Sequence, residues 1–131
     1  MIVVIDTSAA VEIVLQRSPA GGLNRKVETA DWVIAPMLFI CEVTNVFWKY
    51  HRFKNMPMEE CESGIDLCIG LVDTYFKESD LYQEAFQMAC MAGRPVYDMY
   101  FLVLARRNNA RLLTTDRGLT DVAREHAIRV A

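Results

Sequence analysis

The first eight residues, MIVVIDTS, constrain the fold more than any other stretch. Residues 2–5 are four consecutive β-branched residues, and Asp6 ends the run. An apolar run without polar alternation is typical of a strand that is buried on both faces of a parallel sheet. Because helix-compatible residues follow at once, we expect Asp6 at the carboxyl end of a central strand. Ligands of open α/β sheets bind at this edge, where an acidic side chain suits a cation or a reacting water.

Short apolar runs alternate with helical patterns along the rest of the chain. This order is typical of a parallel sheet with helices on both faces. We therefore predict an α/β fold, a three-layer α/β/α sandwich with a mostly parallel sheet of about five strands. A chain of 131 residues suffices for one such domain and is too short for two, so we expect a single domain over residues 1–131. Further strands are predicted at 32–35, 72–76, 111–114 and 128–130, helices at 7–16, 23–30, 37–53, 58–71, 79–92 and 97–107, a turn at 17–22 and a short helix after 118.

The cysteines and the apolar runs bear on the compartment. The four cysteines form no CxxC pair and lie in apolar helical contexts, so we expect free, buried thiols as in a reducing cytoplasm. Asp6 interrupts the first apolar run, and no run of about 18 apolar residues occurs. A cytoplasmic protein without signal peptide or membrane span is therefore predicted. The cysteines are Cys41, Cys61, Cys68 and Cys90.

Three aspartates fall at the same predicted edge of the sheet. Asp6 and Asp116 each follow a predicted strand, and Asp98 begins a helix that enters from that edge to reach the next strand. An aspartate at a helix start also caps free backbone N–H groups, which contributes about 0.5–2 kcal/mol. Each aspartate, taken alone, is therefore compatible with a structural cap or with a functional site.

Glu42 is harder to explain as a structural residue. Its neighbours three and four positions away include Leu38, Phe39 and Val46, which place it on the mostly apolar face of its helix. Burying an isolated carboxylate there is costly. An arginine, a proton or a metal ion must compensate, and the sequence leaves these three alternatives open.

A metal would also explain why several acids converge. Clustered carboxylates repel one another without a cation, and ligands that are all oxygen favour Mg²⁺ or Mn²⁺ over zinc. The sequence does not choose between one metal and two. The formal charge of −3 does not exclude an anionic substrate, because setting aside four of the 17 acidic residues leaves 14 basic residues against 13 acidic ones.

Three segments resemble the PIN-domain nucleases, and specifically the VapC toxins of bacterial and archaeal toxin–antitoxin pairs. They are MIVVIDTSAA, PMLFICEVTNVFWKY and VYDMYFLVLARRNNARLLTTDRGL. The resemblance implies an endoribonuclease that uses Mg²⁺ or Mn²⁺ to activate water, a homodimer and a cognate antitoxin partner. It also implies that an acidic quartet holds the metal and catalyses cleavage, and that three hydroxyl side chains orient ligands or water. The quartet maps onto Asp6, Glu42, Asp98 and Asp116, and the hydroxyl residues onto Thr7, Ser8 and Thr114.

Other residues are candidates for contacts with RNA or a partner. Arg117 directly follows Asp116 and is the best placed to reach the substrate. The exposed aromatics predicted at Trp48 and Tyr50 would suit a partner or dimer surface. Two other functions stay open: a PIN fold kept only for binding a partner, and a receiver-like domain that accepts phosphate on aspartate. The receiver would require paired acids after the first strand and a lysine after the last, which this chain lacks. The remaining phosphate candidates are Arg17, Arg25, Lys26, Arg52, Lys54 and Arg94.

Overall fold

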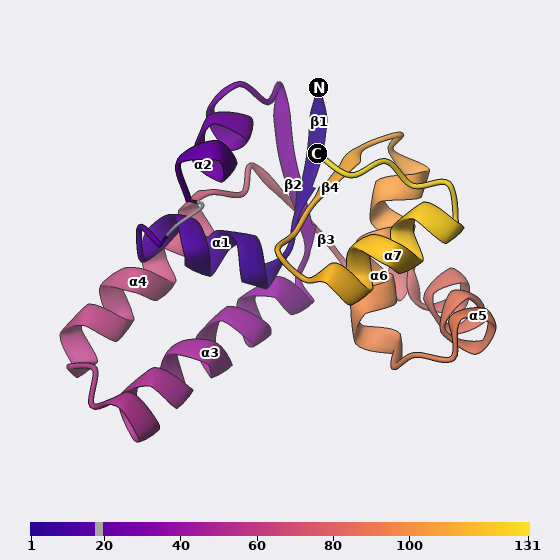
Figure 1. Cartoon of the computed structure of the whole chain (residues 1–131). Coiled ribbons are helices and arrows are strands. Elements are labelled where there is room, and N and C mark those ends of the chain that lie inside the picture. The colour runs from indigo at the N-terminus through magenta and orange to yellow at the C-terminus, as the bar shows by residue number, and fades with distance from the viewer. Residues whose placement is uncertain (18–19) are drawn as a thin grey trace.

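The computed structural model describes residues 1–17 and 20–131 of the chain. Strands and helices alternate from the N-terminus, as the apolar runs predict (Figure 1). The strands are β1 (Ile2–Ile5), β2 (Trp32–Pro36), β3 (Thr74–Phe76) and β4 (Arg111–Leu113). The helices are α1 (Thr7–Val14), α2 (Ala20–Glu28), α3 (Leu38–Lys54), α4 (Met58–Gly70), α5 (Tyr82–Ala92), α6 (Val96–Arg107) and α7 (Arg117–Glu125), with a 3-10 turn, η1 (Glu78–Asp80), before α5.

The four strands form one parallel sheet in the order β3-β2-β1-β4. Val4 of the central strand β1 pairs with Ile34 on one side and with Leu112 on the other. The predicted position of Asp6, at the carboxyl end of a central strand, is thus confirmed. The prediction of about five strands is slightly high, because Val130 forms only a single parallel bridge to Leu112.

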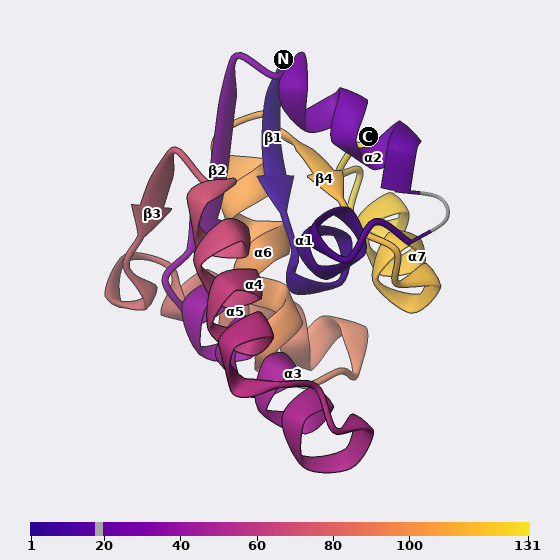
Figure 2. The ribbon, with the colours of Figure 1, turned by 90° about the vertical axis from the view of Figure 1, so that its left-hand side faces the viewer.

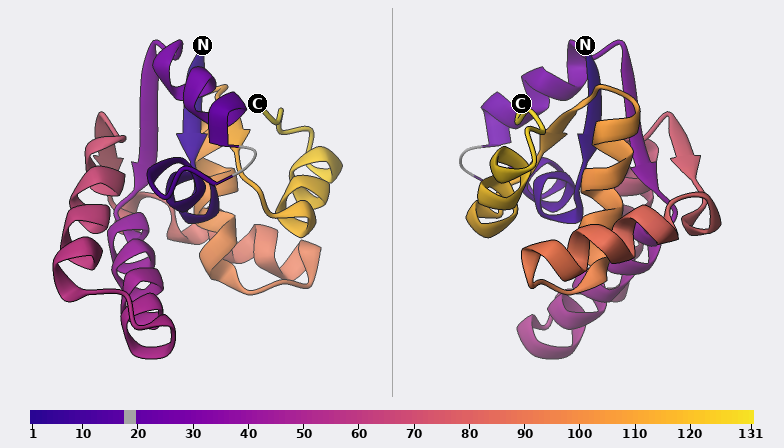
Figure 3. Two further views of the ribbon diagram at one scale, coloured as in Figure 1. Left: turned by 60° about the vertical axis from the view of Figure 1, so that its left-hand side comes forward. Right: turned by 90° about the vertical axis from the view of Figure 1, so that its right-hand side faces the viewer.

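Helices cover both faces of the sheet and make the predicted three layers. The helices α1, α2 and α4 lie on one face, and α5, α6 and α7 lie on the other (Figures 1 and 3). The helix α3 begins at the carboxyl end of β2 and extends beyond the sheet in that direction (Figure 2). The edge of the sheet at which Asp6 lies is therefore bordered by helix starts.

The core is built around β1 and α6. Val3, Val4 and Ile5 are fully buried, as expected for a strand that is covered on both faces. The helix α6 packs between the sheet and α5, and its residues 101–105 are all buried. A helix that is apolar on nearly every side is a core helix, so α6 fixes Asp98, in its first turn, relative to β1.

The long helices α3 and α4 pack closely through a single glycine. A Cβ atom at Gly64 would lie 2.5 Å from the Phe47 ring. Phe47 is fully buried, so its ring has little room to move. Glycine at this position therefore sets the distance between α4 and the helix that carries Glu42.

Some local predictions differ from the structure. The helix predicted from residue 79 begins as the 3-10 turn η1, and α5 starts only after Leu81, which is buried. Gly21 and Gly22, predicted to lie in a turn, belong to α2, while Ser18-Pro19 lies outside the described residues. Within the described chain, no helix is both long and apolar enough to cross a membrane.

The cysteine prediction is half wrong. Cys61 and Cys68 are buried, but Cys41 and Cys90 are exposed. On α3 the buried residues are Phe39, Val43 and Phe47, which recur every four positions, and Cys41 lies between them on the outer face. The apolar composition of the segment did not reveal this difference in orientation.

Candidate active site

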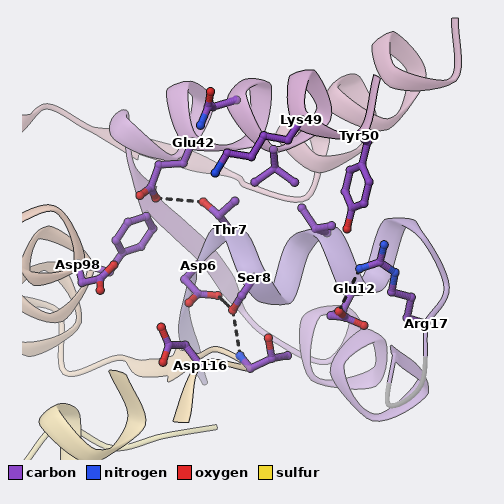
Figure 4. A pocket seen from close by; sticks show the side chains of 15 residues that line it. Asp6, Thr7, Ser8, Glu12, Arg17, Glu42, Lys49, Tyr50, Asp98 and Asp116 are labelled. Atoms are coloured by element: carbon purple, nitrogen blue, oxygen red, sulfur yellow. Dashed lines mark hydrogen bonds and ion pairs between the residues drawn. The ribbon is translucent and has the colours of Figure 1, made fainter. Parts of the chain in front are cut away.

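A cleft of about 440 Å³ opens at the carboxyl edge of the sheet (Figure 4). Asp6, Glu42, Asp98 and Asp116 all line it, although they come from four separate segments of the chain. The side chains of Thr7 and Ser8 line it as well. The fold therefore brings the four predicted acidic residues to one place.

Asp6 is both a helix cap and a wall of the cleft. Its Oδ1 atom accepts hydrogen bonds from the Ala9 backbone N–H at 2.9 Å and from the Ser8 hydroxyl at 2.7 Å. Its Oδ2 atom accepts from the Thr114 hydroxyl. Burial raises the pKa of Asp6, the hydrogen bonds oppose this effect, and the charge of Asp116 adds to it. The cap and the site are thus compatible roles of one carboxylate.

A hydroxyl network joins the end of β4 to the start of α1. The Ser8 and Thr114 hydroxyl oxygens lie 3.2 Å apart. Ser8 accepts the Thr115 N–H at 3.0 Å, and Thr114 accepts the Asp116 N–H at 3.0 Å. Asp116 in turn caps α7 by accepting the Leu119 N–H at 3.1 Å. This network fixes the loop that carries Asp116 beside Asp6.

Glu42 lies on α3 across the cleft from Asp6. It accepts a hydrogen bond from the Thr7 hydroxyl at 3.0 Å. Burial raises the pKa of Glu42 to about 7, and the charges of Asp98 and Asp6 add to the effect. In the part of the chain that the structure describes, no arginine or lysine lies within ion-pair distance of it. Of the three compensations that the sequence left open, a proton or a cation therefore remains.

Asp98 is the acidic residue with a basic partner. Its Oδ2 atom lies 3.4 Å from Nη2 of Arg94. Burial raises the pKa of Asp98 and Asp116 adds to this, while Arg94 lowers it. The Arg94 guanidinium also lies over Gly118, where a Cβ atom would come within 2.7 Å of Nη1. Arg94, predicted only as one of several phosphate contacts, thus bridges the starts of α6 and α7.

The donors in the cleft fit a hard divalent cation. All four are carboxylates, and burial together with negative neighbours raises the pKa of three of them, so a cation would relieve their repulsion. Over residues 1–17 and 20–131, no three acidic, histidine or cysteine side chains form a ready-made metal cage. Mg²⁺ does not require one, because it usually binds through one or two carboxylates and keeps several waters.

The cleft continues from the acidic residues along α3. Its other part is lined by Lys49 and Tyr50 from α3 and by Glu12 and Arg17 (Figure 4), and Asn45 of α3 lines the cleft as well. Lys49 and Asn45 were not predicted from the sequence. The sequence did offer a signal: Asn45 follows Glu42 by three residues and Lys49 follows it by seven, and residues at these spacings lie on one face of a helix.

Arg117 and the predicted surface aromatics have different positions. Arg117 is exposed at the first position of α7, and it is not among the described residues that line the cleft. Trp48 is 54% exposed, whereas Tyr50 is half-buried and faces the cleft. The two aromatics therefore belong to different surfaces of α3.

All four acidic residues lie within a segment that matches a known protein family. The PIN domain family matches residues 3–125. The chain belongs to the PIN domain family. This match confirms the resemblance carried by the three sequence segments, and it gives no support to the receiver-like alternative.

Similar proteins and structures come from Pyrobaculum aerophilum and Rickettsia felis. The chain is 26% identical over 123 residues to Ribonuclease VapC3 of Pyrobaculum aerophilum. The matched region covers 92% of this chain and 94% of the relative. The crystal structure of PAE2754 from Pyrobaculum aerophilum matches with a TM-score of 0.74 at 18% identity, over 93% of this chain and 87% of that one. VapBC2 from Rickettsia felis, bound to a DNA fragment from its promoter, matches with a TM-score of 0.65 at 15% identity, over 93% of both chains.

Proposed function

We propose that this PIN domain is an endoribonuclease that depends on Mg²⁺ or Mn²⁺ and acts as the toxin of a toxin–antitoxin pair in the cytoplasm. The observation that carries the proposal is the convergence of Asp6, Glu42, Asp98 and Asp116 on one cleft. The likeness to a relative named a ribonuclease supports the same activity.

The proposed roles follow from the contacts in the cleft. The four carboxylates hold the metal, which, when bound, lowers the pKa of a coordinated water and neutralises charge on the phosphate. The Thr7 hydroxyl holds Glu42, and the hydroxyls of Ser8 and Thr114 hold Asp6. These hydroxyl groups orient the carboxylates and thereby set which lone pairs face the cleft.

The test is cleavage of total cellular RNA by the purified protein with Mg²⁺, with Mn²⁺ and with a chelator. We expect discrete cuts that disappear with the chelator and in Asp98→Asn. Asp66→Asn is a matched control, because Asp66 is an exposed acid on α4 outside the cleft. Cleavage by Asp98→Asn at the wild-type rate would contradict the proposal. Absence of both cleavage and metal binding by calorimetry would favour the non-catalytic binding module.

We propose an antitoxin protein and a second copy of the chain as partners. The likeness in fold to VapBC2 supports a protein partner. Exposed Trp48 and Phe53, at 54% and 65%, make an edge-to-face pair on α3 that suits such a contact. Light scattering of the protein alone tests the homodimer, and co-purification with the product of a neighbouring gene tests the antitoxin.

A further inference from the structure

Resting on the proposed ribonuclease function, we propose that the end of the cleft remote from Asp6 is a binding site for a nucleotide of single-stranded RNA. In this site Lys49 binds a backbone phosphate, and Tyr50 together with Arg17 stacks on a base. The site adds a second contact with the strand, apart from the carboxylates.

The position of Lys49 supports the phosphate contact. Lys49 is seven residues after Glu42 on the same face of α3, about 10 Å along the helix axis. Long side chains on a helix lean toward its N-terminus, and in Figure 4 the Lys49 side chain extends along α3 toward Glu42. No described acidic side chain lies within ion-pair distance of Lys49. Its ammonium group is therefore available for an anion inside the cleft.

Tyr50 and Arg17 supply flat surfaces beside this cation. The Arg17 guanidinium lies 5.1 Å from the centroid of the Tyr50 ring, and Arg17 lies 3.6 Å from the Glu12 carboxylate. The Tyr50 ring packs against the Phe47 ring, with ring centroids 6.0 Å apart. Figure 4 shows the Tyr50 hydroxyl end directed at Arg17. Aromatic rings and arginine planes are the surfaces on which unpaired RNA bases stack.

The charges of the cleft favour RNA as the occupant over an acidic protein segment. The four carboxylates lie at one end, the Lys49 side chain extends toward them along α3, and the far end carries Arg17, which pairs with Glu12. A strand whose phosphate lies at the metal end and whose next nucleotides run along α3 meets the bound metal, then the ammonium group of Lys49, and then the flat surfaces of Tyr50 and Arg17. An acidic peptide would meet the carboxylates along the same path without needing the stacking surface.

The experiment measures, by fluorescence anisotropy, the binding of a fluorescein-labelled pool of random ten-nucleotide RNA. The protein is the Asp98→Asn variant, which should not cleave the RNA, and Mg²⁺ is present. In that background, Lys49→Gln should weaken binding about tenfold. It should also reduce the slope of log K against log salt by about 0.7, the value of one lost phosphate contact. Lys77→Gln, an exposed lysine outside the cleft, is the control.

The stacking surface has a different signature. Tyr50→Leu keeps apolar packing against Phe47 but removes the ring, and it should weaken binding about tenfold with the salt slope unchanged. Tyr50→Phe should bind like the parent protein. Phe86→Leu, an exposed aromatic on α5, is the control. Thermal unfolding checks that each variant folds. If Tyr50→Leu does not fold, Arg17→Gln replaces it, and because it also removes a positive charge it should lower the salt slope as well as the affinity.

The outcomes separate this site from the nuclease activity. If folded Lys49→Gln and Tyr50→Leu bind RNA like their parent, the nucleotide site is overturned, whether or not the wild-type protein cleaves RNA. If the wild-type protein fails to cleave but both variants lose binding with the expected slopes, the site stands and the nuclease proposal fails. An acidic peptide that competes with the RNA pool equally in both variants and their parent would also overturn the site.

Discussion

Glu42 couples protonation to folding at the scale of a single residue. Its pKa is about 7 in the folded protein against an ordinary value of 4.5, so folding favours the protonated form. The stabilisation is complete below about pH 4.5 and is lost as pH rises through 7. We expect the metal-free protein to be about 1–2 kcal/mol less stable at pH 8 than at pH 5, after discounting for the partial exposure of the carboxyl. Urea unfolding in chelator measures this difference.

Two comparisons isolate the contribution of Glu42. Glu42→Gln should lose most of the fall between pH 5 and pH 8, leaving a smaller part from Asp6 and Asp98, whose pKa values are also raised. Mg²⁺ should restore stability at pH 8 in the wild-type protein more than in the variant. An equal pH dependence in both proteins would show that Glu42 ionises freely in the folded state.

Gly118 keeps space for the arginine that contacts Asp98. In Gly118→Ala the new Cβ atom would lie 2.7 Å from Arg94 Nη1 and 3.3 Å from Asp116 Oδ1, so the flexible guanidinium must leave its present position and the Asp116 carboxylate must give slightly. We expect cleavage to fall about 10- to 100-fold, the usual effect of disturbing a neighbour of a metal ligand. Stability should stay equal or rise by up to about 1 kcal/mol, because alanine favours a helix.

The matched control for Gly118 is Gly70→Ala. Gly70 ends α4, and a Cβ atom there would meet no other atom within 4 Å. It should cleave RNA at the wild-type rate. Wild-type cleavage by Gly118→Ala, measured in parallel, would mean that shifts of Arg94 and Asp116 at this position do not affect the acidic site.

At the scale of elements, the α3–α4 pair depends on Gly64. In Gly64→Ala the added Cβ atom would lie 2.5 Å from the ring of buried Phe47. Overpacking of a core costs about 1–3 kcal/mol, which exceeds the gain in helix propensity. Urea unfolding should show this loss. A double variant, Gly64→Ala with Phe47→Leu, should recover part of it, and no recovery would place the strain elsewhere.

The elements that could be predicted are those with a local cause. The strand β1 is buried because its apolar residues leave no polar face, and the strand ends at Asp6, the first charged residue after that run. The positions of Asp98 and Asp116 at the same edge of the sheet follow from the alternation of strands and helices. The delayed start of α5 was not predictable from the local pattern, which does not distinguish the 3-10 turn at Glu78–Asp80 and the buried Leu81 from a continuous helix.

The contacts that could not be predicted join distant segments. Arg94 touches Asp98 from the preceding turn, which spacing of four residues suggests, but its contact with Gly118 requires α7 to pack beside α6. The Arg17–Tyr50 pair likewise requires the end of α1 to reach α3. Such pairs depend on the crossing of helices, and a single sequence carries no direct signal for it.

At the scale of the whole molecule, the charge distribution makes RNA binding depend on a divalent cation. The chain carries a formal charge of −3, and the cleft has four carboxylates at one end, so phosphates are repelled until a cation neutralises that end. Each such repulsion amounts to about 1 kcal/mol in water at 4 Å and more in a partly buried site.

We expect the wild-type protein to bind the ten-nucleotide RNA pool at least tenfold more tightly with 5 mM Ca²⁺ (on the order of a saturating divalent concentration) than in chelator at matched ionic strength. At pH 8, where Glu42 is mostly ionised, Glu42→Gln removes its negative charge and should show a smaller difference. Equal affinities in calcium and chelator would mean that the RNA does not approach the acidic end of the cleft.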